Sequence, residues 1–255
     1  MKIGGIIDIS TKDIPHKSAM VIFTVGCNFK CDFCHNKYLL QLNVGREYEI
    51  NELIDMITTN LLVTGVSITG GEPTLQKDLL DLCKEIQKVG KYLSIDTNGS
   101  NPDIIRKIAP YVNRVALDLK GPPDPEKLET IARIKVDLGR IKDTIEFLNS
   151  QMEIDFEIRT TYIADLLNNH DIKNIMRFLT KMGFSGNFVL QQYLFSEGVG
   201  EEFKRIFSKP EHEELVKILS PFKDLKFPFK IYLRDDIVGY RIIDKLNDVR
   251  LEDTK

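Results

Sequence analysis

Strand-like and helix-like patterns alternate along most of this 255-residue chain. Short apolar runs rich in β-branched residues are each followed by a segment in which apolar residues recur every three or four positions. Such alternation predicts an α/β protein with a parallel sheet, whose strands are joined by right-handed helical crossovers. After an opening strand in residues 2–10, the expected strands are residues 19–25, 65–69, 92–96, 114–118, 154–159, 188–192 and 229–233. The expected helices are residues 51–60, 76–89, 102–108, 168–181 and 211–219, and residues 126–150 are expected to be mostly helical.

About six strand–helix units follow the opening strand, fewer than close a full barrel. We therefore predict a partial (β/α)6 barrel with an open parallel sheet. With 42% hydrophobic residues, the chain is long enough for one large core. We predict a single domain over residues 1–255, with its core at about residues 18–195 and a C-terminal extension at about residues 196–255.

Polar side chains and glycines recur where the expected strands end. In α/β folds, ligands bind at the carboxyl ends of parallel strands, where the loops are free to vary. One polar group at one strand end would mean little, but a series of them indicates a single binding site. The candidates are Cys27 to Cys34, Gly70 to Glu72, Asp96 to Asn98, Asp118 and Lys120, Arg159 to Thr161, and Gln191 with Gln192.

Three cysteines, Cys27, Cys31 and Cys34, lie within eight residues in the loop after the first of these strands. Thiolates this close together can all face one soft metal centre, and iron–sulfur clusters take such ligands. Cys83 lies on the apolar side of an expected helix, so we predict that it is a core thiol. A cluster held by only three cysteines would keep one iron open to a substrate.

Two other uses of these cysteines were weighed. A zinc site of the three cysteines with His35 has suitable ligand types, but His35 is adjacent to Cys34, which strains convergence. No second ligand pair follows at the spacing of a zinc finger. Disulfides are disfavoured, because three clustered thiols without a partner suit a reducing compartment.

Composition narrows the classes of partner. The net charge of −3, with acids interspersed among the lysines, argues against nucleic acid as the main partner. No apolar run approaches the roughly twenty residues of a membrane span, and we find no secretory signal pattern. We expect a cytoplasmic protein with no membrane partner.

The spacing C-x3-C-x2-C, with Phe33 before the last cysteine, resembles the cluster loop of the radical S-adenosylmethionine (SAM) enzymes. The resemblance implies that Cys27, Cys31 and Cys34 hold a [4Fe-4S] cluster, whose open iron binds the amino and carboxylate groups of SAM. An electron from the reduced cluster then cleaves SAM to give a 5′-deoxyadenosyl radical. Phe33 is expected beside the adenine.

Gly70, Gly71 and Glu72 supply two positions where backbone can approach a ligand closely and a carboxylate that can accept from an ammonium group. A strand-to-helix turn with an acid at the helix start has the same pattern. In radical SAM enzymes the matching Gly-Gly-Glu contacts the methionine amino group. The resemblance therefore implies this role for Gly71 and Glu72.

Further candidates follow the next strands. Asp96 and Asn98 fit an Asx-type turn, or they could hold ribose hydroxyls or a monovalent cation through oxygen ligands. Asp118 and Lys120 fit a surface ion pair, whereas the resemblance implies that they help to hold SAM. Arg159 is a further candidate, for the SAM carboxylate or for a partner.

The order Gly-Gly-Glu-Pro, Asp-Thr-Asn-Gly, Asp-Leu-Lys resembles the activating enzymes of glycyl radical enzymes. Residues 4–5, 13–15, 26–31, 69–75, 96–100, 159–161 and 190–192 resemble in particular the archaeal-type activating proteins of anaerobic (class III) ribonucleotide reductase. The resemblance implies that the deoxyadenosyl radical removes an α-hydrogen from a glycine of a partner enzyme. Electrons would come from a flavodoxin or ferredoxin.

Two alternatives stay open at this point. A radical SAM enzyme acting on a small molecule or modified nucleoside would carry the same motifs. A non-catalytic zinc or electron-transfer module would share only the cysteines.

The C-terminal part suggests one more hypothesis. Gly239 and Tyr240 echo the glycyl-radical loop of the partner enzymes, so this tail could imitate the substrate loop, although a plain glycine turn has the same pattern. His170 and His212 lie in polar helix starts and are expected to be solvated.

Overall fold

The computed structural model describes residues 1–195 and 206–248, and its chain divides into two compact units. The first unit comprises Met1–Lys30, Asn36–Leu117 and Asp137–Phe156. The second comprises Cys31–His35, Asp118–Val136 and the described residues from Glu157 onward. The single domain expected from the sequence stays a prediction.

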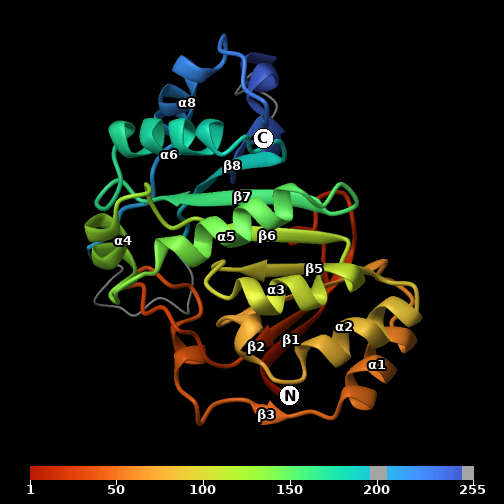
Figure 1. The fold of residues 1–255 in the computed structure, drawn as a ribbon. Coiled ribbons are helices and arrows are strands. Elements are labelled where there is room, and N and C mark those ends of the chain that lie inside the picture. Colours follow the sequence, from red (N-terminus) through yellow and green to blue (C-terminus); the bar gives the residue numbers. More distant parts are fainter. Residues whose placement is uncertain (196–205, 249–255) are drawn as a thin grey trace. The chain divides into compact units, whose positions relative to one another are not determined.

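The first unit is built on a mostly parallel sheet with the strand order β3-β1-β2-β4-β5-β6 (Figure 1). The parallel strands β2, β4, β5 and β6 have the same order in the sheet as in the chain, with the register Ile22↔Ile68 between β2 and β4 and Ile68↔Ile95 between β4 and β5. Their bounds are Ala19–Thr24, Gly65–Gly70, Tyr92–Thr97 and Arg114–Asp118. The near-continuous apolar runs of these strands are explained by burial on both faces.

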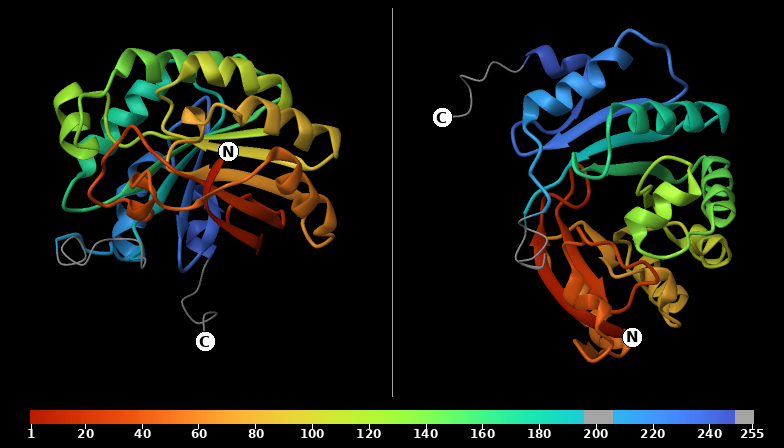
Figure 2. Two further views of the ribbon diagram at one scale, coloured as in Figure 1. Left: turned by 90° about the horizontal axis from the view of Figure 1, so that it is seen from below. Right: turned by 90° about the vertical axis from the view of Figure 1, so that its left-hand side faces the viewer.

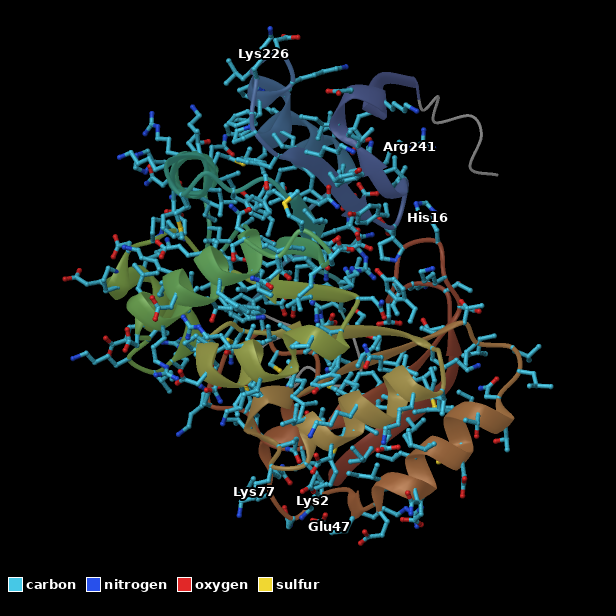
Figure 3. The ribbon with its side chains drawn as sticks, turned by 45° about the vertical axis from the view of Figure 1, so that its right-hand side comes forward. Lys2, His16, Glu47, Lys77, Lys226 and Arg241 are labelled. Atoms are coloured by element: carbon cyan, nitrogen blue, oxygen red, sulfur yellow. The ribbon has the colours of Figure 1, made fainter. Side chains whose placement is uncertain are left out.

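The opening strand β1, Lys2–Ser10, pairs antiparallel with β2 on one side and with the short strand β3, Arg46–Glu47, on the other. Lys2 is the register partner of Glu47, and Figure 3 shows the two labelled side chains at the same edge of the unit. This edge is antiparallel, in contrast to the core strands.

Helices of the first unit connect the parallel strands, and α2 and α3 lie on the same face of the sheet (Figure 2). The helix α2 buries Leu79, Leu82, Cys83 and Ile86, which recur at helical spacing, and Cys83 is a fully buried core thiol as predicted. The helices are α1, Ile50–Thr59; α2, Leu79–Lys88; α3, Pro102–Ile108; and α5, Leu138–Asn149. Short 3-10 turns occupy Lys37–Leu40, Pro73–Leu75 and Ala109–Tyr111.

The second unit contains the strands β7, Asp155–Tyr162, of which the first two residues belong to the first unit, β8, Asn187–Gln192, and β9, Lys230–Asp235. These three strands are parallel, and β10, Gly239–Ile242, returns antiparallel to β9. The helices are α4, Pro125–Ala132; α6, Asn169–Lys181; and α8, His212–Leu219. Turns of 3-10 type cover Ser220–Phe222 and Ile243–Asp248.

The α/β class with an open parallel sheet, predicted from the alternation, is confirmed. Residues 126–150, expected to be mostly helical, form two helices with a break between them. Arg133 adopts a left-handed backbone conformation that ends α4, and the Asp137 side chain caps the start of α5 by accepting from two backbone N–H groups. Within the described ranges, no helix is both long and apolar enough to cross a bilayer.

Candidate functional site

The glycine turn after β4 is held against the start of the cysteine loop. Gly71 N donates to Thr24 O at 2.9 Å, and Glu72 N donates to Gly26 O at 2.7 Å. A Cβ on Gly71 would lie 2.0 Å from Gly26 O, and one on Gly70 would lie 2.3 Å from Thr24 N. Gly70 also has a φ of +117°, which a side chain would strain. The glycines are therefore required by the chain's own backbone, a reason that the sequence pattern did not reveal.

The Glu72 carboxylate is buried and fully engaged by donors of the first unit. Its Oε1 accepts from Thr74 N, Thr74 Oγ1 and Thr97 Oγ1 at 3.1, 2.6 and 2.7 Å, and its Oε2 accepts from Asn98 N at 2.7 Å. Burial raises the pKa of this carboxyl above its ordinary value, although these four donors oppose the rise. Glu72 thus ties the end of β4 to the end of β5, and its contact with the SAM ammonium stays a prediction.

Asn98 lies beside the first cysteine. Its Nδ2 donates to Asn28 Oδ1 at 2.8 Å and lies 4.0 Å from Cys27 Sγ. Asn28 Nδ2 donates in turn to Ser100 Oγ at 2.8 Å, and Phe29 N donates to Cys27 Sγ at 3.3 Å. The Cys27 sulfur therefore lies close to two N–H donors, an arrangement that orients a thiolate ligand.

Asp96 lies near the positive charge of Arg114 in the same sheet. Its Oδ1 lies 3.8 Å from Nη1 of Arg114, and the side chain of Arg114 is almost completely buried. Arg114 Nη1 also donates to Ser94 Oγ at 2.8 Å. The carboxylate expected to hold a ribose or a cation thus has a charged neighbour that the sequence did not indicate, and its ligand role stays a prediction.

In the second unit, Asp118 lies between two cations. Arg159 Nε donates to Asp118 Oδ1 at 2.9 Å, and Lys120 Nζ donates to Asp118 Oδ2 at 3.1 Å. Burial by itself would raise the pKa of Asp118, but the Arg159 and Lys120 charges outweigh it and hold that pKa well below its usual range. Arg159, predicted from a different strand end, is therefore brought together with Asp118 and Lys120 as one charged group.

Cys31 and Cys34 belong to the same unit as this group. Burial raises the pKa of the Cys31 thiol to about 11, while the Lys120 charge opposes the rise. Burial lowers the pKa of Lys120, but the charges of Asp118, Cys31 and Cys34 outweigh it, so the net pKa lies above its usual range and the ammonium stays charged. If Cys31 held a metal it would do so as the thiolate, without its proton, and the Lys120 cation would stabilise that thiolate.

Three further contacts fix the segment around these cysteines. Arg133 Nε donates to Asp32 Oδ2 at 2.5 Å. The His35 ring stacks on Tyr193 at 5.4 Å, and its Nε2 lies 2.6 Å from Leu194 O. Burial lowers the pKa of His35, which favours the neutral ring. His35 is thus packed against its own unit, which disfavours the zinc set that included it.

Phe33, two histidines and Tyr240 are the remaining positions with a prediction from the sequence. Phe33 is buried, and its place beside the adenine stays a prediction. The prediction that His212 is solvated was wrong: its Nδ1 lies 2.6 Å from Asp235 Oδ2, and its side chain is mostly buried. His170 is exposed as expected. Tyr240 lies in β10 and donates to Glu157 Oε2 at 2.8 Å, so the idea of a substrate-mimicking tail stays a hypothesis.

None of the four cysteines forms a disulfide, and among the described residues no three His, Cys, Asp or Glu side chains are arranged to hold a single metal ion. A family profile described as "Radical SAM superfamily" matches residues 21–180. The chain belongs to the radical SAM superfamily. It is a radical SAM enzyme, and membership implies a [4Fe-4S] cluster and SAM as cofactors. Cys27, Cys31 and Cys34 form no disulfide and have the ligand chemistry that such a cluster takes, and their role as its ligands stays a prediction.

Relatives within the superfamily differ in their named activities. A protein of Methanocaldococcus jannaschii named "Putative glycyl-radical enzyme activating enzyme" is 33% identical over 87% of this chain and 93% of its own length. The GTP 3′,8-cyclase of Aquifex aeolicus is 26% identical over 80% of this chain and 65% of its own length. The superfamily is thus established, whereas the reaction is not decided by these relatives.

A solved structure shares the fold. SuiB of Streptococcus suis, bound to S-adenosylmethionine, superposes with a TM-score of 0.66 at 17% identity. The match covers 84% of this chain and 50% of SuiB. At this identity the likeness supports the open α/β fold alone.

Proposed function

We propose that this radical SAM enzyme is an activase that reductively cleaves SAM at its [4Fe-4S] cluster and generates a glycyl radical on a partner enzyme. The observation that carries the proposal is the 33% identity to the M. jannaschii protein, which extends over 87% of this chain and 93% of that protein. The order of motifs that resembles activating proteins of anaerobic ribonucleotide reductase makes that reductase the first partner to test.

The cysteines and the charged group around Asp118 have separate proposed roles. Cys27, Cys31 and Cys34 are the proposed cluster ligands, and the bound cluster supplies the electron for cleavage of the SAM sulfonium. The Asp118, Lys120 and Arg159 group would hold the charged methionine end, because it offers both signs of charge within hydrogen-bonding distance of each other. The other proposed SAM contacts are Phe33, Gly70, Gly71, Glu72, Asp96 and Asn98.

One-electron cleavage of the SAM sulfonium would release methionine and the 5′-deoxyadenosyl radical. The deoxyadenosyl radical takes one hydrogen atom from the α-carbon of a partner glycine, which gives 5′-deoxyadenosine and leaves the unpaired electron on the glycine. A glycine suits this step because its α-carbon carries no side chain. The electron consumed in SAM cleavage must come from an external donor, a flavodoxin or a ferredoxin.

The test is electron paramagnetic resonance of the anaerobically reconstituted, reduced protein mixed with SAM and anaerobic ribonucleotide reductase. We expect a glycyl doublet on the reductase together with 5′-deoxyadenosine. Cys31→Ala should abolish both, whereas Cys83→Ala, the same change outside the loop, should retain both. Formation of 5′-deoxyadenosine by the wild-type protein without any glycyl doublet would contradict activation of this partner.

A second candidate is a radical SAM enzyme that acts on a nucleotide or modified nucleoside. It is favoured by the similarity to GTP 3′,8-cyclase and by a 7-carboxy-7-deazaguanine synthase of Thermoplasma acidophilum, which is 27% identical over 69% of this chain and 75% of its own length. Turnover of GTP or a deazaguanine precursor in the absence of any protein partner would support it.

A further inference from the structure

A groove of about 520 Å³ lies in the second unit between α6 and the segment that follows α8. We call it the α6 groove. Met176 lines it from α6, and Phe222, Leu225 and Phe227 line it from the other side. None of these residues belongs to the groups described above.

The apolar side of the α6 groove is anchored in the core. The Phe227 ring lies 6.1 Å from Phe222 and 5.1 Å from Phe229, and Phe229 lies 5.4 Å from the fully buried Phe184. Leu225, by contrast, is 57% exposed. A firmly packed aromatic wall with an exposed leucine at its edge is typical of a surface that accepts an apolar side chain.

The α6 side of the groove carries a row of cations. Lys173, Arg177 and Lys181 line it at intervals of four residues, so they share one helical face, and all three are exposed. Within the described residues none of the three forms an ion pair, and like charges at this spacing destabilise a helix. The row spans about 12 Å along the helix axis.

Other helices of this chain pair such cations with their own acids. On α2, Lys84 pairs with Asp81 at 3.3 Å and Lys88 pairs with Glu85 at 2.6 Å. The acid at the start of α6, Asp171, is already engaged by Lys127 at 3.2 Å. The positive charge along the α6 groove therefore has no compensation of this kind on its own helix.

Two more lysines lie close to Leu225 in the sequence of the segment after α8. They are Lys223 and Lys226, with Asp224 and Leu225 between them. Figure 3 shows the labelled Lys226 extending outward from the second unit. A basic surface on a chain whose formal net charge is −3 is a local feature and not a consequence of overall composition.

We propose that the α6 groove is a docking site for an acidic helical segment of a partner protein. The segment would carry Asp or Glu at intervals of four residues, opposite Lys173, Arg177 and Lys181, and one or two large apolar side chains that fill the space beside Phe227 and Leu225. Charge complementarity selects an acidic partner, and the apolar wall selects a protein over a nucleic acid, whose phosphates would leave that wall unfilled. This inference does not depend on the reaction proposed above.

The probe is a fluorescein-labelled, capped helical peptide with Glu at every fourth position and Leu and Phe on the adjoining face. Its binding to the full-length protein is measured by fluorescence anisotropy at low and moderate salt. We expect saturable binding that weakens as salt rises. Arg177→Glu and Leu225→Asp should each weaken it at least tenfold, whereas Lys107→Glu, which reverses an exposed cation on α3, should leave it within twofold.

Circular dichroism melting of each variant excludes loss of folding as the cause. The proposal is overturned if the peptide does not bind, if a peptide with Lys in place of Glu binds equally well, or if Lys107→Glu has the same effect as Arg177→Glu. It is also overturned if single-stranded RNA displaces the peptide at lower concentration than unlabelled peptide does. Self-association that Arg177→Glu abolishes would assign the groove to a second copy of this chain and would equally overturn it.

Discussion

Glu72 and Asp118 are both acids that the sequence places at strand ends, yet they have opposite surroundings. Glu72 is almost inaccessible and accepts hydrogen bonds from neutral donors of the first unit. Asp118 is about one-third exposed and lies between the cations of Arg159 and Lys120 in the second unit. The difference teaches that one carboxylate is used to hold strand ends together, whereas the other belongs to a charged group that solvent, and hence a ligand, can reach.

The largest expected effect is on stability, and it comes from replacing Glu72. Glu72→Ala leaves buried donors on Thr74, Thr97 and Asn98 without their acceptor, so we expect the free energy of unfolding to fall by about 3 kcal/mol. Urea unfolding followed by circular dichroism measures it. Glu153→Ala removes an exposed carboxylate from the same unit and should change stability by under about 0.5 kcal/mol. Equal changes in stability for the two replacements would contradict the structural role of Glu72.

Replacement of Asp118 should change SAM binding more than the free energy of unfolding. Asp118→Asn removes the charge that holds Lys120 and Arg159, so we expect SAM binding to weaken about tenfold. Isothermal titration of the reconstituted protein with SAM gives the dissociation constant. Asp236→Asn is the matched control, because Asp236 also pairs with a lysine, Lys209 at 2.6 Å. A SAM affinity that falls equally in both variants would contradict a specific role for Asp118.

Much of this organisation could be predicted from local sequence pattern. The strand ends of residues 70–72, 96–98 and 118–120 were placed correctly, because buried strands are short apolar runs and amphipathic helices have periodic apolar residues. The break at Arg133 was missed, because the sequence around it keeps a helical composition. A left-handed residue that is not glycine has no strong local pattern.

Contacts between residues far apart in the chain could not be predicted in this way. Arg159 and Asp118 are 41 residues apart, and Arg133 and Asp32 are 101 residues apart, so neither ion pair follows from periodicity. The same holds for His212, whose partner Asp235 lies on a later strand. The closeness of Gly71 to Gly26 likewise depends on how two strands align, although glycine alone suggested a close approach.

A smaller effect, on the midpoint potential of the cluster, is expected from replacing Asn98 in the first unit. Asn98→Ala removes an N–H donor near the Cys27 sulfur, which should leave a bound thiolate more electron-rich. We expect the midpoint potential of the cluster to become more negative by on the order of tens of millivolts. A redox titration followed by electron paramagnetic resonance measures the shift. Asn101→Ala, which removes a donor to Thr74 O in the same loop, should leave the potential unchanged.

The smallest expected effect concerns the apo protein at high pH. The pKa of Cys31 is raised to about 11 in the folded protein from an ordinary value near 9, so the unfolded chain loses this proton first as pH rises. The contribution of Cys31 to stability is therefore complete below about pH 9 and is lost progressively toward about pH 11. Unfolding free energies measured across this range for the wild type and Cys31→Ala should converge as pH rises. A constant difference would contradict the burial of a protonated thiol.

The most direct test of glycyl radical activation follows the hydrogen atom itself. Anaerobic ribonucleotide reductase is prepared with glycine deuterated at the α-carbon and incubated with the reduced protein and SAM, and the 5′-deoxyadenosine is analysed by mass spectrometry. We predict one deuterium in the 5′-deoxyadenosine, and none when the reductase is unlabelled. Formation of 5′-deoxyadenosine without deuterium from the labelled reductase would show that the hydrogen comes from elsewhere and would contradict the proposed reaction.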